Sequence, residues 1–395
     1  MKYYAEIINE NGNIAVDDTI LIKDVNSSAG SHILEGYKPL FSAQVVEKLT
    51  KNGYEIKGKT NVGEFGLDLV GEFSYYNEFE DDKTLKGAAA QAVKSGDVKA
   101  ALCVDMNGSA RRAAALSDVT FLKPTYGTVS RYGVISCAAS GEQIGVCANN
   151  ADTVAEVMGV IAGNDEKDGT SLRNDSYTYS TNEQIKKVCV VKELLDKADD
   201  DVKADINSYI ETLKAQGITV DEISFDFFDY ANTAWQILMC AETCNNVSRY
   251  DGVKYGHRSE NYRNIDELYV NSRTEGFNFL TKAVILYGSD ALSKSRYTDC
   301  YEKALKIRRI VADKMSELFA KYDAVLTPVC KSKEYTAYDI KDAFTKVFEE
   351  SVFTAVPNLV GIPAVACGNK QFMAKQFDEN KLLTLAKLGE RNGDK

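Results

Sequence analysis

Long apolar runs and runs of basic residues are both missing from this 395-residue sequence. No stretch approaches the roughly 20 apolar residues that cross a bilayer, and the first 18 residues lack the basic and apolar parts of a secretion signal. The formal net charge is −11, so the chain has no basic surface suited to gripping phosphate backbones unaided. We therefore expect a cytoplasmic protein with no membrane contact, which meets nucleic acid, if at all, only indirectly, through a partner.

Paired cysteines and histidines are also scarce. The nine cysteines form no C-x-x-C pair, a pattern that suits reduced thiols rather than a disulfide framework. Cys240 and Cys244 have the i,i+4 spacing of metal ligands, but no second ligand pair lies near them, and buried thiols on a helix are the simpler interpretation. His32 and His257 are the only histidines, which makes a Ser/His/Asp triad hard to assemble and favours a lysine base. We expect no metal site.

Prolines number only five, and the sequence has no repeat or low-complexity linker, so we expect a single domain over residues 1–395. Helical periodicity alternates with short β-branched runs, which predicts an α/β protein. The region 230–322 is mostly helical in pattern, and residues 75–84 are typical of a solvated acidic loop. Predicted helices cover residues 42–52, 87–94, 151–163, 201–216 and 340–350, and predicted strands cover residues 19–25, 186–191, 218–225, 323–328 and 362–368. Residues 54–66 are predicted to form a further strand followed by a turn.

Two residues stand out for chemistry. Ser109 ends the turn Asn107-Gly108-Ser109, which can present a hydroxyl beside free backbone N–H groups. Lys23 lies within TILIKDV, where a short buried strand would place a cation among apolar residues. The alternative is a solvated lysine at the exposed end of that strand.

An ordered series of segments resembles the amidase signature family: LIKDV, GKTNVGEF, NGSARR, FLKPTYGTVSRYGVIS and DGTS. The segments SRYDGVKYGHRSE, KALKIRR, AVLTP, VPNLVGIPA and FDE are similar to the A-type subunit of the glutamyl-tRNA(Gln) amidotransferases within that family. The resemblance implies an α/β amidase-signature fold, a large mixed β-sheet flanked by helices on both faces. It also implies that the helices preceding the lysine strand in full-length relatives are missing.

The resemblance also implies a catalytic arrangement. In that family a lysine in a G-I-P-I-x-I-K-D strand acts through a cis-serine on a serine in D-T-G-G-S-I-R, which attacks the glutamine amide and releases ammonia. By position the base is Lys23, the nucleophile is Ser109, and the oxyanion turn is Met106, Asn107 and Gly108. Asn107 replaces a glycine there, and asparagine tolerates a left-handed conformation better than most residues.

Three further positions follow from the same resemblance. The cis-serine lies 24 positions before the nucleophile in the family, where this chain has Leu85, and the neighbouring Thr84 is the available substitute. Arg308 is expected to bind the α-carboxylate of a glutamine substrate, and Asp378 its α-ammonium group. Because Leu85 cannot relay a proton, glutaminase activity is expected to be impaired.

The function implied is the ammonia-producing subunit of an amidotransferase that converts Glu-tRNA(Gln) to Gln-tRNA(Gln). The expected partners are glutamine or another small amide, together with a B-type subunit and with a small C-type subunit. We expect no cofactor in this chain, since ATP and Mg would belong to a partner subunit. Two alternatives stay open: a catalytically inactive scaffold or binding subunit, or a stand-alone amidase for small amides.

Overall fold

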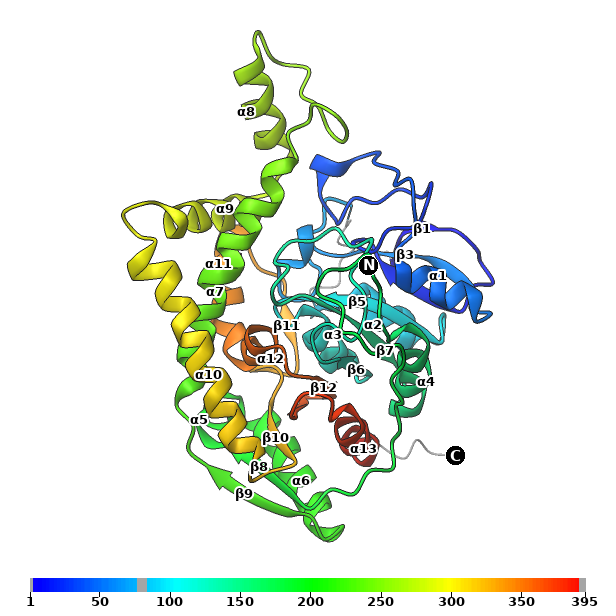
Figure 1. Ribbon diagram of the computed structural model, residues 1–395, viewed down its shortest axis with the longest axis vertical. Coiled ribbons are helices and arrows are strands. Elements are labelled where there is room, and N and C mark those ends of the chain that lie inside the picture. The colour runs from blue at the N-terminus through cyan, green and yellow to red at the C-terminus, as the bar shows by residue number, and fades with distance from the viewer. Residues whose placement is uncertain (1–2, 77–83, 391–395) are drawn as a thin grey trace.

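The computed structural model describes residues 3–76 and 84–390 (Figure 1). Within them one mixed sheet has 11 strands in the order β1-β3-β2-β5-β7-β6-β12-β13-β10-β8-β9. Its strands are β1 (Tyr4–Ile7), β2 (Ile14–Asp17), β3 (Ile56–Thr60), β5 (Ala100–Asp105), β6 (Thr120–Lys123), β7 (Gln143–Ala148), β8 (Lys187–Val191), β9 (Thr219–Ile223), β10 (Ala324–Pro328), β12 (Ala364–Cys367) and β13 (Lys370–Met373). A separate ribbon pairs β4 (Thr84–Leu85) with β11 (Tyr335–Thr336).

Helices cover both faces of the sheet, as predicted. Alternate residues of the strands point to opposite faces, so Ile14 and Val16 of β2 pack into one apolar cluster while Ala15 packs into another. The first face is covered by α1 (Gln44–Lys51), α4 (Ala151–Ile161), α6 (Asp200–Ala215) and α13 (Glu379–Gly389). The second is covered by α2 (Ala88–Lys94), α3 (Ser109–Ser117), α7 (Phe227–Asn246) and α12 (Ala355–Val360). The predicted large mixed sheet with flanking helices is therefore confirmed.

The helical region predicted for residues 230–322 is also confirmed. After α7 come α8 (Ile265–Gly276), α9 (Phe279–Leu292) and α10 (Lys303–Phe319), and α9 and α10 both pack on α7. The short helices α5 (Lys192–Lys197) and α11 (Ala343–Glu350) complete the α-helices of the described chain. In Figure 1, α8 stands at the end of the molecule, far from the sheet. None of the helices in residues 3–76 and 84–390 is long and apolar enough to cross a bilayer.

Most of the individually predicted elements are confirmed. The predicted helices appear as α1, α2, α4, α6 and α11, and five of the predicted strands appear as β3, β8, β9, β10 and β12. Most of the predicted loop at 75–84 lies outside the described residues, and its last residue, Thr84, belongs to β4.

The predicted strand at residues 19–25 is wrong. Ile20 makes an isolated bridge to Val134, and Lys23 lies exposed in a turn where Asp24 has a φ of 62°. The strand in this region is β2, which begins at Ile14 and is paired in parallel on both sides, with β3 and β5. Because β2 takes the central place between those strands, the chain has already left the sheet when it reaches Lys23. Its exposed position agrees with the solvated alternative.

Candidate functional site

Ser109 is placed by the turn between β5 and α3. It is the first residue of α3, is partly exposed, and follows Gly108, which has a φ of 83°. The first N–H groups of a helix have no partner within the helix, and the helix dipole makes that end favourable for negative charge. This end of α3 therefore suits a developing negative charge, and the role of Met106, Asn107 and Gly108 as an oxyanion turn stays a prediction.

The back of this turn is held by buried polar contacts. The backbone oxygen of Asn107 accepts hydrogen bonds from Arg112 Nη1 at 2.9 Å and from Thr354 Oγ1 at 3.0 Å. A Cβ atom at Gly108 would lie 2.3 Å from Thr354 Cβ, so only glycine fits. The tolerance of asparagine for a left-handed backbone is not used here, because Gly108 and not Asn107 takes the left-handed position.

A buried ion pair holds the first turn of α3 against the sheet. Arg111 Nε and Nη2 donate to the two carboxylate oxygens of Asp105 at 3.0 and 2.9 Å, and neither side chain is exposed. Burial acts to raise the pKa of Asp105, but Arg111 and the amide of Asn358 outweigh it, and the net effect lowers that pKa. The helix carrying Ser109 is thus fixed in register against β5.

Ser109 lines a narrow cavity of about 60 Å³. A buried water needs roughly 10–15 Å³ of such space, so the cavity can hold on the order of four to six waters, or a slender polar group. Three carboxyl groups line it, from Asp17, Asp68 and Glu142, and the lining residues of the described chain include neither lysine nor arginine. The chemistry next to Ser109 is therefore acidic.

Asp17 lies at the end of β2 and is 3% exposed. Its carboxylate accepts hydrogen bonds from the backbone N–H of Thr19 at 3.0 Å, from the Thr19 hydroxyl, and from the backbone N–H of Val104 at 2.6 Å. Burial raises the pKa of Asp17 to about 6, against the lowering effect of these donors and of Lys59. The cavity wall thus contains a carboxyl group that titrates close to neutral pH.

The structure does not bring the predicted lysine or its relay to Ser109. Lys23 is exposed and does not line the cavity, and its backbone N–H donates to Ser42 Oγ at 3.0 Å. Leu85 is 1% exposed and packs in an apolar cluster, and neither it nor Thr84 lines the cavity. The catalytic roles assigned to these positions stay predictions.

A second lysine, which sequence reasoning missed, is fully buried behind Asp17. Lys59 lies on β3 and pairs with Asp18 at 2.9 Å, and its ammonium group also donates to Ser27 Oγ. Burial lowers the pKa of Lys59, and the carboxylates of Asp18 and Asp17 oppose that shift. The signal in the sequence is the pair Asp17-Asp18 directly after the apolar residues of β2.

Arg308 and Asp378 lie on different helices and neither lines the cavity. Arg308 donates from Nη1 and Nη2 to the hydroxyl and backbone oxygens of Ser140, both at 3.2 Å. Asp378, at the start of α13, pairs with Lys381 at 3.1 Å. Their role in binding a substrate stays a prediction.

Comparison with known proteins shows which family this chain resembles in sequence and in structure. The Amidase family profile matches residues 13–383. The A-type subunit of the glutamyl-tRNA(Gln) amidotransferase of Lactobacillus johnsonii (strain CNCM I-12250 / La1 / NCC 533) is 35% identical, over 96% of this chain and 83% of that protein. The same-named protein of Sulfurihydrogenibium sp. (strain YO3AOP1) is 34% identical, over 94% of this chain and 81% of that protein. The crystal structure of the same-named protein from Thermotoga maritima superposes with a TM-score of 0.82 at 27% identity, and the match covers 99% of this chain and 87% of that one. The chain therefore belongs to the Amidase family, the enzyme family that carries the amidase signature.

Proposed function

We propose that this chain is the A-type subunit of a tRNA-dependent amidotransferase and acts on the side-chain amide of glutamine at Ser109. The similarity to the A-type subunits of glutamyl-tRNA(Gln) amidotransferases supports this assignment. The net charge of −11 is consistent with a subunit that leaves tRNA, ATP and Mg to B-type and small C-type partners.

The observation that carries the proposal is the position of Ser109. Ser109 is the first residue of α3 and lines a narrow cavity. Hydrogen bonds from Arg112 and Thr354 to the backbone oxygen of Asn107 hold the turn before it. Attack on an amide carbon by Ser109 would place the new oxyanion near the N–H groups of this turn, leave a glutamyl ester on the serine and release ammonia. Water would then hydrolyse the ester.

We further propose that this hydrolysis is slow, because Asp17 stands where a lysine is needed. The family motif I-x-I-K-D matches I-A-V-D-D of β2 and the residue after it, which gives Asp17 the lysine position. A carboxylate with a pKa near 6 is a weak base for a serine hydroxyl, and its lone pairs already accept bonds from Thr19 and Val104. Losing general-base assistance costs about 10²–10⁴ in rate.

The second candidate is a scaffold or binding subunit with no hydrolytic role. It is favoured by the carboxyl groups of the cavity wall and by Leu85, whose side chain is buried in an apolar cluster and does not line the cavity. Both candidates predict assembly with partner subunits, whereas a stand-alone amidase would need none.

The test is co-expression with B-type and C-type subunits, followed by measurement of complex formation and of Gln-tRNA(Gln) made from glutamine or from ammonium chloride. The proposal predicts a complex whose glutamine-dependent product is lost in Ser109→Ala and kept in Ser316→Ala, an exposed serine on α10. Product from ammonium chloride alone, with assembly intact, would favour the scaffold. A chain that ignores both partners would contradict the assignment to such a complex.

A further inference from the structure

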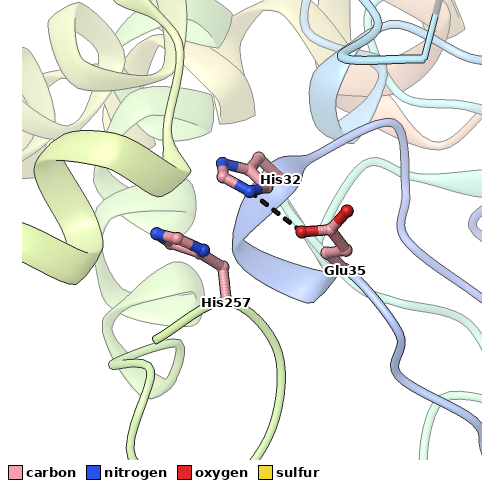
Figure 2. Close-up of side chains that lie close together, drawn as sticks. All are labelled: His32, Glu35 and His257. Carbon is pink, nitrogen blue, oxygen red and sulfur yellow. Dashed lines mark hydrogen bonds and ion pairs between the residues drawn. The ribbon is translucent and has the colours of Figure 1, made fainter. Parts of the chain in front are cut away.

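The only two histidines of the chain lie side by side, although they are far apart in sequence (Figure 2). His32 begins the short helix η1 (His32–Leu34), and His257 belongs to the loop before α8. Their ring centroids are 3.9 Å apart. The backbone holds them there: His257 N–H donates to Ile33 O at 3.1 Å, and a Cβ atom at Gly256 would lie only 2.0 Å from that oxygen.

A carboxylate completes a compact set of ligand atoms. His32, Glu35 and His257 each offer one ligand atom, and these atoms all lie within 4.8 Å of one another. The distance from His32 Nε2 to Glu35 Oε2 is 3.0 Å. Around a tetrahedral Zn²⁺ with bonds of about 2.0–2.1 Å, neighbouring ligand atoms are roughly 3.3 Å apart. Closure on a metal thus requires the widest of these separations to shorten from at most 4.8 Å to roughly 3.3 Å, which side-chain rotation would have to supply.

The hydrogen bonds around the rings leave one nitrogen of each histidine for a metal. His32 Nδ1 lies 3.4 Å from the backbone oxygen of Glu275, and His257 Nε2 lies 2.8 Å from the carboxylate of the same residue. A histidine that donates at these positions presents a lone pair at Nε2 of His32 and at Nδ1 of His257. His32 Nε2 lies 3.0 Å from the Glu35 carboxylate, and a metal bound between them would take the place of the proton that otherwise joins the two atoms.

Glu275 has the surroundings typical of an outer carboxylate in a metal site. Ser259 Oγ donates to its other oxygen at 2.8 Å, so both carboxylate oxygens of Glu275 are engaged, one by Ser259 and one by His257. Metal-binding histidines usually donate their second N–H to such a carboxylate, which fixes the ring orientation.

We propose that His32, His257 and Glu35 bind Zn²⁺, and that Glu275 orients His257. Two imidazoles with one carboxylate suit zinc, whereas Mg²⁺ and Ca²⁺ prefer oxygen ligands. The His32 and His257 side chains are 16% and 18% exposed and Glu35 is 51% exposed, so water can supply a fourth ligand. The metal joins the N-terminal segment to the region of α8, and it stands apart from the Ser109 cavity, with which it shares no residue.

The test is titration of the full chain, purified without a histidine tag, with ZnSO₄ against a chromophoric chelator at pH 7.5. We expect one equivalent of zinc, with affinity reduced more than about 100-fold in His32→Ala and in His257→Ala, and about 10–100-fold in Glu275→Gln. Glu260→Gln, an exposed glutamate in the same loop, is the matched control and should bind like the wild type.

Two further readouts keep the outcome decisive. Cys300→Ser should leave binding unchanged, which separates the site from a partly exposed thiol. Co²⁺ should give the absorption of a nitrogen- and oxygen-ligated ion, without the intense near-ultraviolet band of thiolate ligation. Zinc binding that survives in both histidine variants, or no binding at micromolar metal, would overturn the proposal and leave two histidines paired with Glu35 and Glu275.

Discussion

Replacing Asp17 with asparagine should remove a defined part of the pH dependence of folding stability. Asp17 is almost fully buried in the cavity wall, and its pKa is raised from an ordinary value of 3.8 to about 6. The native state therefore holds this proton more tightly than the unfolded chain does. Stability contributed by the protonated carboxyl is present below about pH 4 and is lost as the pH rises to about 6.

The magnitude follows from the shift itself. Each pKa unit is worth about 1.4 kcal/mol, so a rise from 3.8 to about 6 corresponds to about 3 kcal/mol in all, most of which is lost between pH 4 and pH 7. In Asp17→Asn this contribution disappears. The asparagine has only one acceptor oxygen, so it cannot accept all the hydrogen bonds that the two carboxylate oxygens accept, including the one from the backbone N–H of Val104. This loss costs roughly 1–3 kcal/mol at every pH.

The assay is urea unfolding at pH 4 and pH 7, followed by the fluorescence of the single, fully buried Trp235. The stability of the wild type relative to Asp17→Asn should fall by about 2–3 kcal/mol between the two pH values. Asp221→Asn is the control with the opposite sign, because hydrogen bonds from Lys187 and Tyr322 lower the pKa of Asp221. A wild-type advantage over Asp17→Asn that is constant or grows with pH would refute the reasoning.

Two other substitutions test how the turn before Ser109 is held. Gly108→Ala should destabilise the fold by about 2–5 kcal/mol, from the left-handed φ and from overlap with Thr354, measured by urea unfolding; a neutral result would show that the turn can move. Arg111→Met should cost about 3–5 kcal/mol because it leaves Asp105 buried and unpaired, whereas Arg309→Met on the exposed face of α10 should change stability by less than about 1 kcal/mol. Equal effects of the two arginine substitutions would contradict this account of the ion pair.

Elements with a clear period could be predicted from sequence because their burial is local. The helix α4 shows its apolar face at helical spacing and ends before Gly163, and the strand β8 is a compact apolar run. The strand β2 was missed because all four of its residues are buried on both faces, so it shows no alternation. The nearby residues 19–25 have a stronger β-branched pattern, yet they lie after the sheet.

The contrast between local pattern and distant packing also explains which parts of the candidate site could be predicted from the sequence. The turn that carries Ser109 could be predicted, since it joins two elements that are adjacent in sequence. The neighbours of its hydroxyl could not, because Asp17, Asp68 and Glu142 reach the cavity from separate parts of the chain. His32 and His257 are an extreme case, since only the packing of η1 against the loop before α8 brings them together.

The rate of ammonia release from glutamine tests the central claim most directly, which is that Ser109 is a positioned nucleophile without an amine base. A typical turnover of about 10 s⁻¹, reduced 10²–10⁴-fold by loss of the base, gives about 10⁻³–10⁻¹ s⁻¹. The account predicts a rate in that range for the wild type and for Ser316→Ala, and none above background for Ser109→Ala. A wild-type rate of about 10 s⁻¹ or more, which is that of an ordinary enzyme, would contradict it. A slow rate that is unchanged in Ser109→Ala would also contradict it.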